Sequence, residues 1–208
     1  MSEREEITAI VLAGGRSARF GGPKLEATID GLTVLDRALL AVDQVATSII
    51  VAGPAPVGLP PLAAPLLAVP DMEPFAGPLA ALSGALALAG DGLAIVVGGD
   101  MPALVPEVLR LLLEGLRADA LLDAAILESP ADATVTAVLP VALRVSRAAT
   151  AAVATIDGGD RSLVRFLARL ACRSIPRGDW LPFDSEADTL LDVDTPADLI
   201  RLGGNEIR

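Results

Sequence analysis

The sequence predicts a three-layer α/β/α fold, in which a mostly parallel sheet carries helices on both faces. Strand and helix patterns alternate along the chain, which is typical of this architecture. The composition agrees, since 52% of the residues are hydrophobic but only 2% are aromatic, so Ala, Leu and Val must build the core. The length of 208 residues fits one domain of ordinary size. No linker or repeat divides the chain, and we expect a single domain over residues 1–208.

The first half of the chain is predicted to contain four strands and two helices. Strands are expected where aliphatic residues run together between turn residues, and helices where apolar residues recur every three or four positions. Pro78 favours a helix start, because proline fits the first helical turn. The elements are strands Ile7–Leu12, Ser48–Ala52, Leu66–Val69 and Leu93–Val97, and helices Val34–Val45 and 78–88. The proline-rich stretch Pro54–Pro74 is otherwise predicted to be irregular.

The second half shows the same alternation with weaker patterns. We expect helices Pro106–Leu116, Val145–Ile156, Leu163–Leu170 and Pro196–Leu202, and strands Ala124–Leu127, Thr134–Leu139 and Arg173–Ile175. Thr195 is a suitable N-cap for the closing helix. Ligands of parallel sheets bind at the carboxyl ends of the strands. The segment Ala13–Lys24 and Asp100 should therefore lie at one edge of the sheet.

The segment Ala13–Lys24 is the most informative part of the sequence. It follows a strand and holds four glycines and three cations, Arg16, Arg19 and Lys24, with no acidic residue between Glu6 and Glu26. Glycines let backbone N–H groups approach phosphate oxygens, and the cations neutralise their charge. The spacing is neither a Walker A motif nor G-x-G-x-x-G. A surface loop that is basic by chance is the alternative, but only 16 cations occur in a chain of net charge −11, and their concentration here favours polyphosphate binding.

Asp100 is a candidate magnesium ligand. It follows a predicted apolar strand and two glycines, so its carboxylate should lie at a strand tip beside the glycine loop. The alternative is an ordinary turn or capping aspartate.

A second acidic pair is formed by Asp192 and Asp194, which alternate and can therefore point to the same side of an extended chain. Either could bind metal, or Asp194 could cap the last helix. Asp71 lies in the irregular stretch, where it could be an ordinary loop acid. The segment 158–162 carries Arg161 and could be no more than a turn before a helix.

The bulk properties exclude several classes of protein. The acidic balance argues against nucleic-acid and membrane binding, and no segment has the composition of a signal peptide or a membrane span, so we expect a cytoplasmic protein. The sequence has no histidine and one cysteine, Cys172, which excludes histidine-based catalytic dyads and multi-cysteine zinc sites. Any metal must be held by oxygen atoms, which indicates magnesium or manganese.

The glycine loop also resembles a known family. Leu12-Ala13-Gly14-Gly15-x-Ser17-x-Arg19-x-Gly21-x-Pro23-Lys24 is similar to the signature of nucleotidyltransferases that build molybdenum cofactor dinucleotides. Further resemblances follow in the family's order: Gly77-Pro78-Leu79, Gly99-Asp100-Met101-Pro102, Gly158-Gly159-Asp160-Arg161-Ser162-Leu163 and Asp194-Thr195-Pro196-Ala197-Asp198-Leu199. Together they span the chain from about Ile7 to Leu202.

The resemblance implies a Rossmann-like fold of the nucleotide-diphospho-sugar transferase type and a Mg²⁺-dependent transfer of GMP from GTP to the phosphate of molybdopterin, with release of pyrophosphate. It implies nucleotide binding by Leu12, Ala13, Gly14, Gly15, Lys24, Asp71 and Asp100, and metal binding by Asp100. The charges of the residues add two expectations: catalytic roles for Arg19, Lys24 and Asp100, because the two cations would steady the triphosphate and Asp100 the metal, and metal binding by Asp194 if its carboxylate faces Asp100. The resemblance further implies a transient molybdoenzyme or cofactor-carrier partner.

Alternatives to GTP as the nucleotide stay open in the sequence. Gly14 and Gly77-Pro78-Leu79 resemble the guanylyl branch of the family, whereas Gly99 and the pair Asp192/Asp194 depart from its usual Cys-Asp-Met-Pro and Asn-x-Asn-Thr-Pro motifs. A cytidylyltransferase or a sugar-phosphate nucleotidyltransferase is therefore the alternative enzyme. A nucleotide-binding regulatory module without turnover is the alternative outside catalysis.

Overall fold

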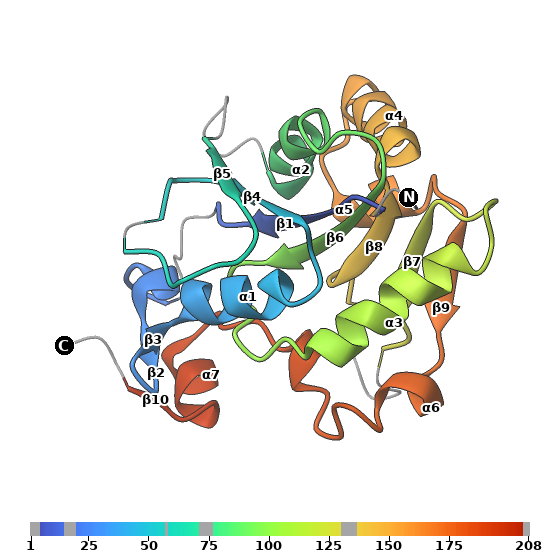
Figure 1. Ribbon diagram of the computed structural model, residues 1–208. Coiled ribbons are helices and arrows are strands. Elements are labelled where there is room, and N and C mark those ends of the chain that lie inside the picture. Colours follow the sequence, from blue (N-terminus) through green and yellow to red (C-terminus); the bar gives the residue numbers. More distant parts are fainter. Residues whose placement is uncertain (1–4, 15–19, 57, 71–76, 130–136, 206–208) are drawn as a thin grey trace.

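The computed structural model describes residues 5–14, 20–56, 58–70, 77–129 and 137–205. Its centre is a seven-stranded sheet in the order β5-β4-β1-β6-β8-β7-β9. Helices cover both faces, as Figure 1 shows, so the predicted three-layer α/β/α fold is confirmed. No helix in the described ranges is long and apolar enough to cross a membrane.

The sheet is mostly parallel, as predicted. Its strands are β1 (Ile7–Leu12), β4 (Ser48–Ala52), β5 (Leu66–Val69), β6 (Leu93–Gly98), β7 (Ala124–Leu127), β8 (Val141–Arg144) and β9 (Cys172–Ile175). Strand β1 pairs in parallel with β4 on one side and β6 on the other, and β8 is antiparallel to both β6 and β7. The carboxyl ends of β1, β4 and β6 therefore meet at one edge, where the sequence places its candidate residues.

Each face of the sheet has its own apolar core. Helices α1 (Val34–Asp43) and α3 (Pro106–Arg117) cover one face, and the short α6 (Arg177–Trp180) contributes the fully buried Trp180 to that core. Helices α2 (Pro78–Leu86), α4 (Val145–Asp157) and α5 (Leu163–Leu167) cover the other face, around Ile10, Leu82 and Phe166. Every residue of β6 is buried, and its side chains contribute alternately to the two cores.

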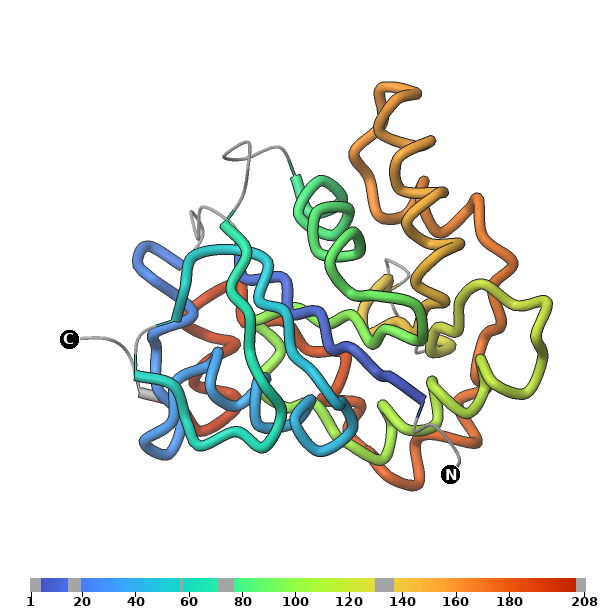
Figure 2. Tube along the Cα trace, turned by 45° about the horizontal axis from the view of Figure 1, so that its top comes forward, coloured from blue at the N-terminus to red at the C-terminus, as the bar shows by residue number. Residues whose placement is uncertain are grey.

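A smaller unit joins the two ends of the chain. Strands β2 (Thr28–Ile29), β3 (Leu32–Thr33) and β10 (Gly204–Asn205) form a three-stranded sheet, against which α7 (Pro196–Arg201) packs. Ile29 and Leu199 are among the residues of its buried cluster. Figure 2 shows the blue segment that holds β2 and β3 beside the red C-terminal segment, away from the end marked N. This unit brings residues of the last turn and helix beside the 3₁₀ helix η1 (Lys24–Glu26).

Several elements of the structure depart from the predicted ones. The predicted strand Thr134–Leu139 is wrong over its described part, because residues 137–139 are irregular and pairing begins at Val141. Pro140 has no N–H to donate to a strand ladder, so the strand starts after it. The two-residue strands β2 and β3 and the four-residue helix α6 were not predicted, since they are too short to show a period. Asp30-Gly31 is nevertheless a sequence signal for the β2–β3 hairpin, and both residues have the positive φ of such a turn.

The end of β1 is held close to the end of β4 by a glycine. The Ala13 N–H donates to the Ala52 carbonyl at 2.9 Å, and Gly53 follows with φ of +149°. A Cβ on Gly53 would lie 2.8 Å from the carbonyl carbon of Ala13 and 3.1 Å from the Gly14 nitrogen. Any side chain at this position would therefore push the start of the glycine loop away from the sheet.

We predict that Gly53→Ala destabilises the protein by about 1–3 kcal/mol, because backbone must move and the φ value suits only glycine. Urea unfolding measures the change. Gly58→Ala is the matched control, since Gly58 also has positive φ (+70°) but no atom within 4 Å of the added Cβ. If the two variants lose equal stability, close packing against Ala13 contributes nothing.

Candidate active site

Two strand ends bring the glycine loop and Asp100 together. The Gly99 N–H donates to the Leu12 carbonyl at 2.9 Å, which continues the pairing of β6 with β1 past the end of the strand. Asp100 then turns its carboxylate back over Gly98, where a Cβ would overlap the carboxylate oxygen. Position 98 must therefore be glycine, because the Asp100 carboxylate fills the space that a side chain there would need.

Lys24 joins Asp100 to a residue far along the chain. It opens η1, and its Nζ lies 2.6 Å from Oδ2 of Asp100 and 3.0 Å from Oδ1 of Asp194. The Lys24 side chain is 13% exposed, against 24% for Asp100 and 46% for Asp194. One partly buried ammonium therefore holds two carboxylates from different elements at the carboxyl edge of the sheet.

The position of Asp194 follows from the backbone beside it. The N–H of Val193 donates to the Asp100 carbonyl at 2.8 Å, and the Val193 side chain is fully buried. The following helix α7 is capped by Thr195, whose hydroxyl accepts the Asp198 N–H while the Asp198 carboxylate accepts the Thr195 N–H. Thr195 is confirmed as the N-cap, so the Asp194 carboxylate is not the cap of this helix and points instead to Lys24.

The electrostatics of the cluster follow from this packing. Burial alone would lower the pKa of Lys24, but the hydrogen bonds and charges of Asp100 and Asp194 outweigh it and raise the pKa, so the ammonium stays protonated. Asp192 keeps part of its surface open to solvent, but loss of surrounding water and the nearby charges of Asp100 and Asp194 raise its pKa to about 6. Asp100 and Asp194 are therefore the carboxylates that pair with Lys24, and the charges of both act on the nearby carboxylate of Asp192.

Asp100 and Asp194 form a suitable donor set for a hard divalent cation. Their oxygens converge on one point, marked here by the Lys24 nitrogen, and oxygen ligands suit Mg²⁺. Within the described ranges no group of three or more Asp, Glu, Cys or His side chains is placed to hold a metal. Mg²⁺ in nucleotide enzymes is commonly bound by one or two carboxylates, with phosphate and water completing the shell. The pair fits that mode of binding.

A cavity of about 650 Å³ lies beside Lys24. Its lining includes Ala13 and Pro54, Glu26 of η1, and Thr33 and Asp36 at the start of α1. This volume falls in the range of small-ligand sites. The cavity therefore places space for a ligand next to the ammonium.

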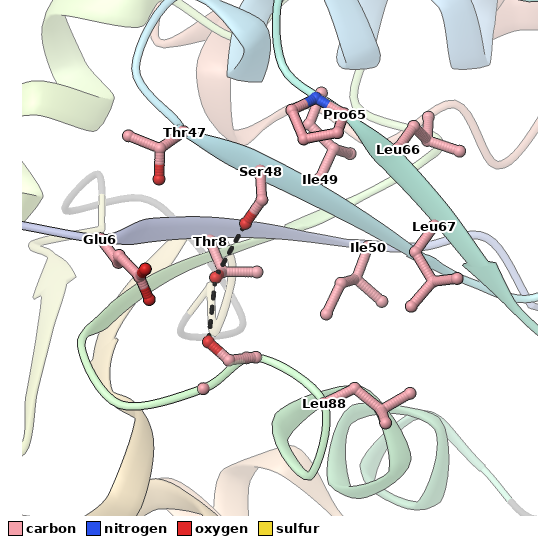
Figure 3. A pocket seen from close by; sticks show the side chains of 12 residues that line it. Glu6, Thr8, Thr47, Ser48, Ile49, Ile50, Pro65, Leu66, Leu67 and Leu88 are labelled. Carbon is pink, nitrogen blue, oxygen red and sulfur yellow. Dashed lines mark hydrogen bonds between the residues drawn. The ribbon is translucent and has the colours of Figure 1, made fainter.

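A separate hollow of about 530 Å³ lies at the opposite, amino edge of the same strands (Figure 3). Its floor is the Thr8 hydroxyl, which donates to the Ala89 carbonyl and bonds to Ser48. The described residues that line it include no Lys or Arg, so they offer no positive charge to a phosphate.

The remaining candidate residues divide into two groups. Leu12 ends β1, and Ala13 and Gly14 follow it, Ala13 buried and Gly14 exposed. Gly15, Arg19 and Asp71 lie outside the described residues, so their predicted roles stay predictions.

The segment 158–162 packs beside the start of α2. The Arg161 Cβ lies 3.7 Å from the position of a Cβ on Gly77, the N-cap of α2. The sequence pattern leaves open whether this segment is only a turn before a helix, and this contact with α2 does not assign it a role in the site.

The comparisons with known proteins agree with this geometry. Residues 9–173 match the model of the MobA-like NTP transferase domain. A protein of Deinococcus radiodurans named probable molybdenum cofactor guanylyltransferase is 34% identical over 111 residues, which are 53% of this chain and 55% of that protein. The molybdenum cofactor guanylyltransferase of Sinorhizobium fredii is 38% identical over 87 residues, 39% of each chain. The chain thus spans about half the length of the curated relatives that it matches first.

Solved structures extend the likeness to almost the whole chain. The molybdopterin-guanine dinucleotide biosynthesis protein A of Archaeoglobus fulgidus superposes with a TM-score of 0.72 and 25% identity, covering 94% of this chain and 96% of that one. A 2-C-methyl-D-erythritol 4-phosphate cytidylyltransferase of Thermus thermophilus superposes with a TM-score of 0.65 and 20% identity over 93% and 96%, which shows the shared fold alone. Since the family model covers residues 9–173, with Lys24 and Asp100 among them, the chain belongs to the MobA-like NTP transferase domain family.

Proposed function

We propose that this protein transfers GMP from GTP to the phosphate of molybdopterin in a Mg²⁺-dependent reaction that releases pyrophosphate. The observation that carries the proposal is the cluster of Lys24, Asp100 and Asp194, at the strand ends of a chain that belongs to the MobA-like family. A transient molybdoenzyme or cofactor carrier, in the cytoplasm, would then receive the product.

The residues present suit phosphoryl chemistry without a general base. An acceptor phosphate has a second pKa of about 6, so it is largely dianionic at neutral pH. It can therefore attack the α-phosphate without first losing a proton to the protein. Lys24 neutralises triphosphate charge, and Arg19 is proposed to assist it. A divalent ion held by Asp100 and Asp194 would supply positive charge to the α-phosphate. The strand ends hold these groups in fixed positions, which favours in-line approach of two anions.

The assays must distinguish the proposed function from two alternatives. A cytidylyltransferase or sugar-phosphate nucleotidyltransferase on the same fold is favoured by Asp192 and Asp194, which stand where guanylyl relatives have asparagine. A regulatory module without turnover is disfavoured, because Lys24 and Asp100 are both present and in contact. Turnover of each NTP with molybdopterin and Mg²⁺ is the deciding measurement.

Asp100→Asn is predicted to lower turnover by at least about 100-fold while the protein stays folded, because the variant loses one of the two charges that hold the metal. Steady-state rates and thermal unfolding measure the two effects. Asp30→Asn is the matched control, since Asp30 is an exposed aspartate in the β2–β3 turn. A rate near that of the wild type at limiting Mg²⁺ would refute the role of Asp100.

GTP is predicted to outcompete CTP and UTP. We propose that the purine lies against the backbone of Gly14, so that Gly14→Ala weakens GTP binding through a methyl clash while the fold persists. Competition between labelled and unlabelled NTPs measures the preference, and Gly22→Ala serves as a loop control because its added Cβ meets no atom within 4 Å and its φ is not in the left-handed region. If CTP is the better substrate of the unmodified protein, the cytidylyl alternative replaces the guanylyl one.

Asp194→Asn is predicted to raise the Mg²⁺ concentration for half-maximal rate by about tenfold, yet to leave substantial activity at saturating Mg²⁺. An amide keeps an oxygen ligand but loses the charge. The matched comparison is Asp192→Asn, whose side chain lies nearby but makes no hydrogen bond or ion pair to Lys24. An unchanged Mg²⁺ requirement in Asp194→Asn removes Asp194 from the metal site.

A further inference from the structure

Lys24 is the only lysine in the 208-residue sequence. Its ammonium contacts Asp100 at 2.6 Å and Asp194 at 3.0 Å, and these are the two carboxylates that the proposed function assigns to the metal. An ammonium and a divalent cation repel each other strongly at such short range. The oxygens that now accept hydrogen bonds from Nζ therefore cannot bind the metal closely while Lys24 keeps its present position.

The surroundings hold the ammonium in place. The Lys24 side chain is only 13% exposed, so its charge is poorly solvated and depends on the two carboxylates. A partly buried cation leaves its partners at low cost only when another anion replaces them. Among the described residues that line the cavity beside it, Lys24 is the one cation, whereas Glu26 and Asp36 are acidic, so Lys24 is the group of this lining that would attract an incoming anion.

We propose that Lys24 is an internal counter-ion of the metal site, which passes from Asp100 and Asp194 to the nucleotide phosphates as the metal binds. The inference rests on the proposed function for the identity of the anion. Its consequence is that metal and nucleotide bind as a linked pair. The triphosphate draws Lys24 away and frees the carboxylates, and it also supplies the oxygens that two carboxylates alone do not provide.

Two observations support this linkage independently. The first is the contact of one Nζ with both carboxylates. The second is that the described residues hold no third metal-binding side chain at this point. The contact with Lys24 makes it costly for the metal to bind without the nucleotide. The lack of a third side chain leaves such a metal ion with too few protein ligands.

Binding of Mn²⁺ to nucleotide-free protein tests the competition, with the free ion measured by electron paramagnetic resonance. Lys24→Met keeps the length of the side chain and removes its charge, and it should bind Mn²⁺ about tenfold more tightly than the wild type. Lys24→Arg keeps the charge and should bind Mn²⁺ as the wild type does. Arg165→Met changes the net charge equally at an exposed helical position and should also have no effect.

An unchanged or weaker Mn²⁺ affinity in Lys24→Met, in protein whose thermal unfolding is cooperative, overturns the proposal. Equal gains in Lys24→Met and Arg165→Met do so as well, because they would reflect net charge alone. The readout needs no turnover. If the protein prefers another NTP but Lys24→Met gains affinity, the proposed substrate is wrong and the counter-ion role stands.

The single lysine allows a second test without any substitution. Protein labelled with ¹⁵N-lysine gives one side-chain Nζ resonance, which can be assigned to Lys24 at once. GTP and Mg²⁺ together should shift this resonance, whereas Mg²⁺ alone at the same concentration should shift it by less than one fifth as much. An Nζ resonance that does not move with GTP and Mg²⁺, under conditions where GTP binding is measured by calorimetry, overturns the exchange of partners.

Discussion

The ion pairs of Lys24 are the constraint on which the candidate site depends. They join positions 76 and 170 residues apart in the sequence, on the 3₁₀ helix after the glycine loop, the end of β6 and the turn before α7. No single element could gather these charges. A partly buried ammonium between two carboxylates is stable because each charge compensates the loss of water around the others. The three segments that carry the charges are thereby fixed relative to one another.

The rest of the fold serves this arrangement in a clear order. Parallel pairing of β1 with β4 and β6 aligns their carboxyl ends, and hydrogen bonds from Ala13 and Gly99 extend the alignment beyond the strands. Gly53 permits the close approach of two chain segments, while Gly98 leaves room for the Asp100 carboxylate. The small sheet and α7 then bring residues 192–194 beside Asp100. Backbone pairing and packing thus position the three segments, and the ion pairs then orient the side chains of Lys24, Asp100 and Asp194.

The proposed function requires a strongly acidic protein to bind an anionic substrate. The net charge of −11 repels anions at long range, but screening limits that repulsion to about 8–10 Å at physiological salt. Within that distance, the balance of positive and negative side chains around the site determines whether an anion is attracted. Asp192 is exposed, yet partial loss of surrounding water and the nearby charges of Asp100 and Asp194 raise its pKa, which indicates that negative charge is concentrated here. Under the proposed function, phosphates that arrive with a divalent cation would therefore bind better than phosphates alone.

The sequence by itself determined the layered α/β fold, the bounds of β1, β4, β5 and β7, and the location of Lys24 and Asp100 at the carboxyl edge of the sheet, because apolar periodicity and glycine loops are local signals. It did not determine the strand at Val141, the hairpin and the helix α6, whose patterns are short or interrupted by proline. Nor did it decide between the two roles of Asp194, since a carboxylate before a helix suits a cap and a ligand equally well. Only the tertiary structure excluded the cap, because Thr195 caps the helix and the Asp194 carboxylate contacts Lys24. That contact spans 170 residues, and no local pattern encodes a distance across the sheet edge.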